Sequence, residues 1–151
     1  VAEGGRPDAF KLPRPSVDGA PLDFSFSGLK TNIINIIHNA AQRGEELSVP
    51  DLAASFRNAV VDCLMRNFMA AAEQTGAKKL VTAGGVSANS LRRRLAGECK
   101  KRGFELFMPR LSLCGDNGAM VASQGYYEFM AGHTAGYDLN ACAEMPVGQN
   151  A

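Results

Sequence analysis

The stretch Leu80-Val81-Thr82-Ala83-Gly84-Gly85-Val86-Ser87-Ala88-Asn89 decides the fold of the second half of the chain. A short apolar run enters a glycine pair and continues into a segment that can begin a helix. Glycine lets the backbone turn sharply and lets a ligand approach without a Cβ in the way. A helix start presents unpaired N–H groups that suit a phosphate or a nucleotide edge, and Asn89 adds an amide. The alternative is a plain strand-to-helix turn capped by Ser87, and the residues alone leave the two interpretations evenly balanced.

The pattern around this stretch predicts a strand over 79–83, a helix over 88–102, a second strand over 104–108 and a final helix over 116–131. Leu91, Leu95 and Cys99 should face inward on the first of these helices. Strand, helix, strand and helix with short connections indicate a parallel α/β unit. Because two strands cannot cover both faces and both edges of a sheet, we expect its other strands to come from elsewhere.

The first half of the chain is predicted to be helical after an extended start. Residues 1–26 are rich in Pro and Gly and should be extended, residues 27–131 should form the helical and α/β part, and residues 132–151 an irregular tail. Ser25 or Ser27 should cap a helix that runs to about Gln42. A capping box at 48–51 should begin a long amphipathic helix that ends at Gly76. Its apolar stripe is expected to consist of Leu52, Phe56, Val60, Cys63, Leu64, Phe68 and Ala71.

The composition is that of a folded domain with an uneven charge distribution. The 151 residues are 46% hydrophobic and 21% charged, with a net charge of +1. Residues 78–110 nevertheless hold nine basic side chains against Glu98 and Glu105, a weak indication of a surface that faces a polyanion. The four cysteines form no CxxC unit and no apolar run could span a bilayer, so we expect a reducing, cytoplasmic compartment and no membrane. The chain opens without a methionine, and we expect it to begin inside a longer protein.

A second loop, Cys114-Gly115-Asp116-Asn117-Gly118-Ala119-Met120, follows the second predicted strand. It should lie at the same carboxyl edge of the sheet as Gly84 and Gly85, where ligands of open α/β sheets bind. Asp116 could bind a metal ion or a ribose hydroxyl, whereas on its own it is more often a helix N-cap. We therefore expect Asp116 and the glycine pair to open onto a shared hollow.

Other residues argue against a self-contained metal enzyme or hydrolase. His38 and His133 are the only histidines and form no HxxxH pair, and no nucleophile–histidine arrangement is evident. Basic side chains cluster on the helix predicted over 88–102. We prefer the interpretation of a solvated helix face over that of contact with RNA phosphates by about two to one. These side chains are Arg92, Arg93, Arg94, Lys100, Lys101 and Arg102.

Together with Asp23-Phe24-Ser25-Phe26-Ser27-Gly28-Leu29-Lys30-Thr31, the two loops resemble one family closely. It is the tRNA N6-adenosine threonylcarbamoyltransferase family (TsaD or Gcp, once described as an O-sialoglycoprotein endopeptidase). The family pattern has an FSFSGLKT-like segment, an AGGVxAN loop and a CTDNxAM loop in this order. The resemblance covers the chain from about Phe10 to Tyr127.

The resemblance implies an α/β fold related to actin and the sugar kinases, of which this chain is part of one lobe, helix-rich with a small parallel sheet. It implies transfer of a threonylcarbamoyl group from threonylcarbamoyl-adenylate to N6 of the adenosine beside the anticodon of tRNA. It also implies one divalent metal ion, iron or zinc, and threonylcarbamoyl-adenylate or ATP as nucleotide ligand. Gly84, Gly85 and Asn89 would bind this substrate, and Asp116 would be a metal ligand.

Two departures from the family pattern limit what the chain should do alone. Gly115 stands where the family usually has Thr, and the paired histidine ligands and first lobe of the family are not in this sequence. We expect an inactive carboxy-terminal piece with little nucleotide affinity that associates into a homodimer. The alternative is a non-catalytic module that docks tRNA or the other proteins of the threonylcarbamoyladenosine pathway.

Overall fold

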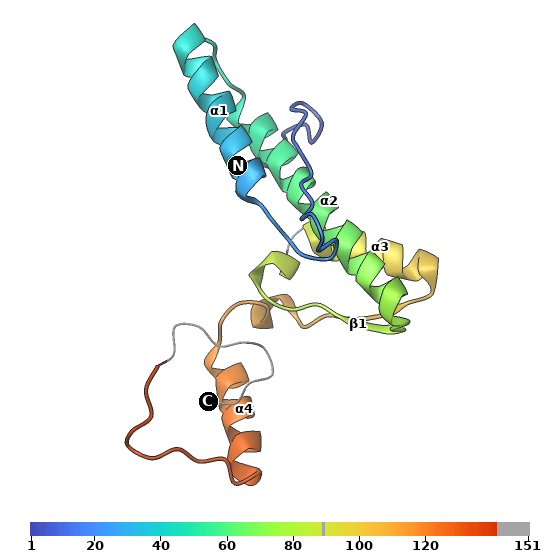
Figure 1. Cartoon of the computed structure of the whole chain (residues 1–151), viewed down its shortest axis with the longest axis vertical. Coiled ribbons are helices and arrows are strands. Elements are labelled where there is room, and N and C mark those ends of the chain that lie inside the picture. Colours follow the sequence, from blue (N-terminus) through green and yellow to red (C-terminus); the bar gives the residue numbers. More distant parts are fainter. Residues whose placement is uncertain (89, 142–151) are drawn as a thin grey trace. The chain divides into compact units, whose positions relative to one another are not determined.

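The computed structural model describes residues 1–88 and 90–141, in which helices predominate over a small sheet (Figure 1). The chain separates into two compact units, residues 1–114 and residues 115–151, and each is described by itself. The elements are α1 (Ser27–Arg43), α2 (Val49–Thr75), β1 (Lys79–Val81), the 3-10 turn η1 (Gly85–Ala88), α3 (Ser90–Arg102), β2 (Glu105–Phe107), the 3-10 turn η2 (Leu111–Leu113) and α4 (Gly118–Met130).

The helix ends follow local chemistry, with one exception. The Ser48 side chain accepts a hydrogen bond from the Asp51 N–H at 3.4 Å and so caps α2, as predicted. Gly44 and Gly76 end α1 and α2 in the left-handed conformation, at φ 67° and 68°. The prediction that Ser25 or Ser27 caps α1 is wrong, because Phe26 occupies the N-cap and makes no side-chain capping bond.

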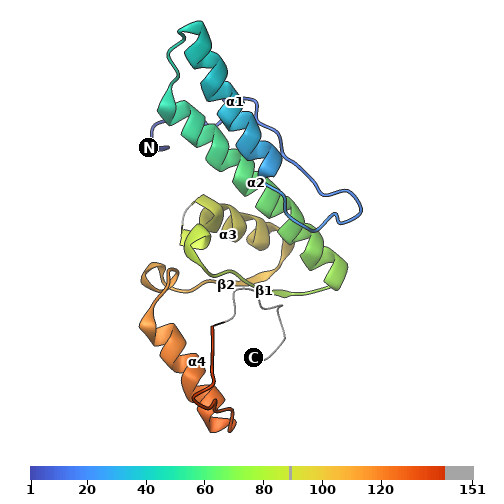
Figure 2. The same cartoon turned by 60° about the vertical axis from the view of Figure 1, so that its left-hand side comes forward.

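The sheet consists of two parallel strands, with Leu80 of β1 paired to Leu106 of β2. One face packs on α3 and α2 through Leu80, Leu91, Leu95, Cys99 and Met69. Figure 2 shows the strands below α3 in this unit. Val81 and Phe107 lie on the opposite face from Leu80 and Leu106 and remain 66% and 45% exposed. In the part of the chain that the structure describes, β1 and β2 pair only with each other.

The N-terminal segment, residues 1–26, lies along α2 and is fixed to it by side chains of that helix. Asp51 accepts the Arg6 N–H at 2.8 Å and also pairs with the Arg6 guanidinium. Ser55, buried in the helix, accepts the Phe10 N–H at 3.1 Å. Leu12 then packs against Leu29 and Ala59, which closes a second apolar cluster between this segment, α1 and α2. Figures 1 and 2 show α1 and α2 side by side.

In the second unit, α4 is capped by Asn117, whose side chain accepts the Met120 N–H at 2.8 Å. Met120, Tyr127 and Met130 of this helix are all more than half exposed. Among the described residues no helix is both long and apolar enough to cross a membrane.

Candidate functional site

The glycine pair lies directly beyond the carboxyl end of β1, as the sequence predicts. Gly84 has φ +82°, a left-handed conformation that favours glycine, and Gly85 begins η1. Both residues are exposed, and among the described residues a Cβ added at either one would meet no atom within 4 Å beyond its chain neighbours. Packing within this part of the chain therefore leaves room for a ligand to approach the turn from outside.

The upstream motif comes close to this turn because α2 fixes it there. Asn67, only 2% exposed, donates from Nδ2 to the carbonyl oxygens of Leu22 at 3.1 Å and Asp23 at 2.8 Å. The next residues carry Phe24 and Phe26, whose rings stack with centroids 6.2 Å apart. The buried amide thus anchors the segment that carries the two aromatic rings, and Phe26 also packs against the cluster of Leu12, Leu29 and Ala59.

These two motifs line one apolar hollow of about 350 Å³ in the first unit. Phe24 and Phe26 come from the upstream segment, and Thr82, Ala83 and Val86 come from the turn after β1. The rest of the lining is supplied by α2 and α3 through Val60, Leu64, Phe68, Leu91 and Leu95. A volume of this size and an apolar lining are typical of part of a small-molecule site.

The second loop begins in the same unit and is held there by α3. Arg92 donates from Nη1 to the Pro109 carbonyl at 2.9 Å, and the same atom lies 3.9 Å from the Cys114 Sγ. Cys114 is buried, and its thiol also lies 3.5 Å from the Arg110 carbonyl. Arg92 therefore ties the first turn of α3 to the segment that leads into Asp116.

Asp116 itself belongs to the second unit and is exposed. The helix that follows is capped by Asn117 rather than by Asp116, so the N-cap interpretation of Asp116 is wrong. Asn89 lies outside the described residues. The shared hollow for the glycine pair and Asp116 stays a prediction.

No group of three or more His, Cys, Asp or Glu side chains in the described ranges could hold a metal ion. His133 instead forms a hydrogen bond with Glu128, with 2.7 Å between its Nδ1 and the Oε2 of Glu128, and this lowers the pKa of the Glu128 carboxyl. His38 is exposed on α1.

The basic side chains of α3 divide into three groups. Arg92 faces the loop after β2, as described above. Three side chains form ion pairs: Arg94 with Asp62 of α2 at 2.6 Å, Arg102 with Glu98 and Glu73, and Lys101 with Glu98 at 3.7 Å. Arg93 and Lys100 are exposed and have no ion pair within residues 1–88 and 90–141.

Asp62 is a residue that the sequence analysis missed, and it joins three segments. Burial opposes its ionisation, but hydrogen bonds from Arg14 and Arg94 outweigh this and hold the pKa of its carboxyl below the ordinary 3.8. Arg14 comes from the N-terminal segment and Arg94 from α3.

Burial raises the pKa of the Cys63 and Cys99 thiols, which makes both poor nucleophiles near neutral pH.

Comparison with known proteins bears on what this arrangement does. The family model described as tRNA N6-adenosine threonylcarbamoyltransferase matches residues 1–123. Curated proteins of that name are similar: one from Listeria innocua is 50% identical over 137 residues, 89% of this chain and 40% of the relative. One from Clostridium botulinum strain Kyoto is 39% identical over 150 residues, 99% of this chain and 44% of the relative. The chain thus spans less than half the length of these relatives.

The extent of the family match and the level of sequence identity show that the chain belongs to the tRNA N6-adenosine threonylcarbamoyltransferase family.

Proposed function

We propose that this chain is the carboxy-terminal part of an enzyme that moves a threonylcarbamoyl group from threonylcarbamoyl-adenylate to N6 of the adenosine beside the anticodon of tRNA. In this proposal it forms part of one lobe of an actin-like or sugar-kinase-like fold. The observation that carries the proposal is the apolar hollow in which the upstream motif and the glycine turn meet. Phe26 of one motif and Thr82 of the other, 56 positions apart in the sequence, line one space there.

The hollow suits the base of the adenylate. Its walls are nearly all apolar and include the stacked rings of Phe24 and Phe26, so the flat faces of a base can pack against them while its polar edge points out of the hollow. The sugar and phosphate would then lie over Gly84 and Gly85, where no Cβ prevents contact with the backbone. Asn89 would donate to or accept from the nucleotide with its amide.

The proposal also gives a role to Asp116, in the loop that follows β2 in the sequence. Its carboxylate is a suitable ligand for a divalent metal ion, iron or zinc. Since the described residues supply one such candidate, the remaining ligands would come from the rest of the full-length protein.

The proposal includes the partners that such a reaction requires. Full-length protein would bind tRNA and the proteins that supply the adenylate, in the cytoplasm where tRNA is modified. The isolated chain would be inactive and would self-associate through the exposed apolar face of the sheet around Val81 and Phe107.

A transfer assay with the full-length protein tests the proposal. Threonylcarbamoyl-adenylate labelled in its threonine is incubated with a tRNA transcript, and label in the RNA is measured. Ala83→Leu fills the hollow and should raise KM for the adenylate about 10-fold, roughly 1.4 kcal/mol. Ala96→Leu, an exposed position of α3 outside the hollow, should leave KM unchanged. Absence of transfer by the wild-type protein would favour a non-catalytic binding module.

A further inference from the structure

The second hollow of the first unit is a charged groove between α2 and α3, separate from the apolar one. It measures about 660 Å³. From α2 it is lined by Asp62, Met65, Arg66, Met69, Ala70 and Glu73, and from α3 by Arg93, Arg94, Gly97, Glu98, Lys101 and Arg102. Five of these side chains are basic and three acidic, so the lining has a net charge of +2. We call it the α2–α3 groove.

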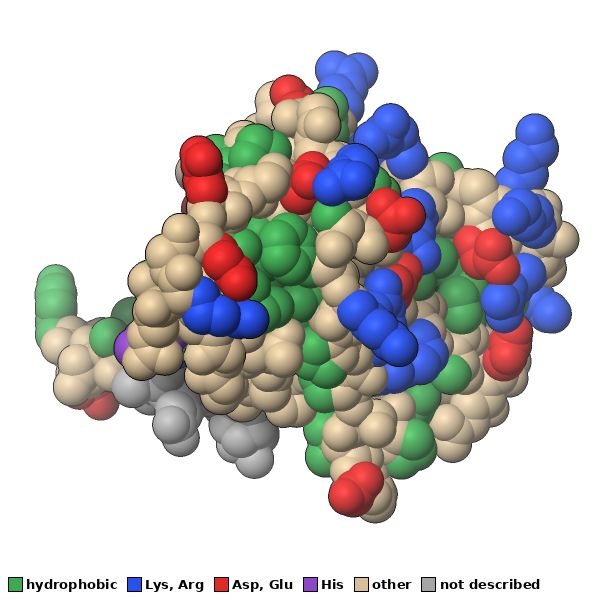
Figure 3. All heavy atoms as spheres, turned by 90° about the horizontal axis from the view of Figure 1, so that it is seen from above, with side chains coloured by type: hydrophobic (Ala, Val, Ile, Leu, Met, Phe, Trp, Pro, Cys, Tyr) green, Lys and Arg blue, Asp and Glu red, His purple; other side chains and the backbone are tan. Residues whose placement is uncertain are grey.

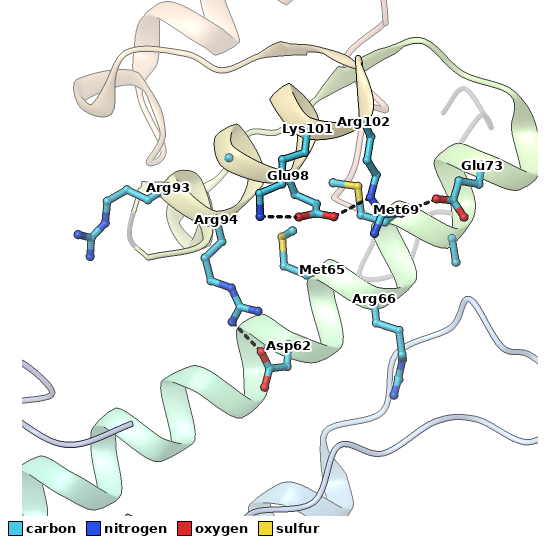
Figure 4. Close-up of a pocket in the computed structure, with 12 residues that line it drawn as sticks. Asp62, Met65, Arg66, Met69, Glu73, Arg93, Arg94, Glu98, Lys101 and Arg102 are labelled. Carbon is cyan, nitrogen blue, oxygen red and sulfur yellow. Dashed lines mark hydrogen bonds and ion pairs between the residues drawn. The ribbon is translucent and has the colours of Figure 1, made fainter. Parts of the chain in front are cut away.

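Ion pairs cross this groove without neutralising it. Figure 4 shows Asp62 facing Arg94, and Glu98 lying between Lys101 and Arg102 with Glu73 beyond. Hydrogen bonds from Arg102 lower the pKa of the Glu98 carboxyl, so this carboxylate is charged at neutral pH. Such exposed pairs are weak and leave guanidinium donors unused, because each guanidinium has five N–H groups. A phosphate can therefore bind these cations without unfolding the network.

Arg93 stands apart from the network. It is exposed, and Figure 4 shows its guanidinium directed away from the other labelled side chains of the groove. No ion pair engages it in the part of the chain that the structure describes. Figure 3 shows Lys and Arg side chains interspersed with acidic ones over the face that it draws.

Gly97 adds a steric argument. A helix with glycine in its interior is less stable than the same helix with alanine there, and Gly97 lies near the middle of α3. A Cβ at this position would meet no other atom within 4 Å, so packing inside the described chain does not require glycine here. It does line the groove, where the missing side chain lets an occupant reach the helix backbone between Arg93 and Lys101.

We infer that the α2–α3 groove binds the sugar–phosphate backbone of the tRNA acceptor, with Arg93 and Lys101 contacting phosphates on either side of Gly97. This inference rests on the proposed function, which makes tRNA the acceptor. The groove has methionine but no aromatic lining residue, so it offers no platform for base stacking. Contacts of this kind position an RNA without reading its sequence.

Paired variants of the full-length protein test this inference through tRNA binding, measured by fluorescence anisotropy over a series of KCl concentrations. Lys101→Gln and Arg93→Gln should each weaken binding and make the slope of log Kobs against log salt shallower by about 0.9. Lys100→Gln is the matched control, because Lys100 is exposed on the same helix but does not line the groove. Gly97→Gln should weaken binding by occupying the groove, whereas Ala96→Gln, one residue away and outside it, should not.

The outcomes separate this inference from the proposed function. Suppose that the wild-type protein transfers threonylcarbamoyl, but that the salt slopes of Lys101→Gln and Arg93→Gln equal the wild-type slope. The groove assignment would then be wrong, and the proposed function would stand. Shallower slopes in a protein without transfer activity would support the groove and refute the transferase. If a polyglutamate peptide bound as tightly as tRNA and needed the same two cations, the groove would be a site for acidic proteins and the inference would be wrong. Unchanged far-UV circular dichroism of each variant excludes loss of fold.

Discussion

Replacing Asn67 by leucine should detach the upstream motif from α2 and destabilise the first unit. Asn67 is 2% exposed, and its amide donates to the Leu22 and Asp23 carbonyls at 3.1 and 2.8 Å. Two hydrogen bonds at about 1 kcal/mol each give about 2 kcal/mol, and the unpaired carbonyls that remain raise this towards about 4 kcal/mol. With a urea m-value of about 2 kcal/mol/M, the unfolding midpoint should fall by about 1 to 2 M.

Far-UV circular dichroism is the appropriate probe for this experiment. The chain has no tryptophan, and Tyr126, Tyr127 and Tyr137 all belong to the second unit, so their fluorescence does not follow the first. Asn39→Leu, at an exposed position of α1, is the control and should change the free energy of unfolding by less than about 0.5 kcal/mol. A change for Asn67→Leu as small as that of the control would refute the assigned role of Asn67.

Three further predictions concern charge, thiols and capping. The pKa of Asp62 is lowered in the folded chain, so its stabilising contribution is present above its ordinary pKa of 3.8 and is lost as the pH falls through the lower folded value. The free energies of unfolding of Asp62→Asn and wild type, from urea melts, should therefore differ at neutral pH and converge in acid. A difference that stays constant with pH would contradict this. Cys63 and Cys99 should resist alkylation until urea unfolds the chain, because burial raises their pKa; mass spectrometry of their peptides checks this, and rapid labelling of the folded chain would count against it. Asn117→Ala should reduce the helicity and stability of α4 by about 1 kcal/mol, whereas Asp116→Ala should not, since Asn117 provides the cap; equal effects in circular dichroism would show that the cap is wrongly assigned.

Local chemistry predicted much of the fold. Gly76 ends α2, Ser48 caps it, and Leu91, Leu95 and Cys99 face inward as their spacing indicates. The two strands pair in parallel, as the strand–helix–strand order requires. The helix ends and the inward-facing side chains depend on residues within a few positions of one another, and the parallel pairing follows from the order of the elements, which is why the sequence was sufficient.

Features that depend on distant residues were not predictable. Phe56, assigned to the buried stripe of α2, is 41% exposed, because the N-terminal segment and α3 cover other sides of that helix. Asn67 and Asp62 looked like ordinary polar positions of an amphipathic helix. Their roles come from partners as much as 48 residues away, such as the Arg14 guanidinium that bonds to Asp62.

The candidate site shows the same division. Its motifs were evident from the sequence, but the meeting of Phe24 with the turn at Gly84 depends on how residues 1–26 lie along α2. The basic cluster of α3 looked uniform in sequence. In the structure Arg92 holds a loop, Arg94 and Arg102 join helices, and Arg93 and Lys101 line the α2–α3 groove.

Photochemical labelling of the full-length protein with an azido-adenine analogue of threonylcarbamoyl-adenylate tests the central claim most directly. The analogue is irradiated in the complex, and the labelled peptides are identified by mass spectrometry. We predict label both in the peptide that contains Gly84 and Gly85 and in the one that contains Asp116, with protection of both by unmodified adenylate. Protectable label confined to peptides that contain neither segment would contradict the account.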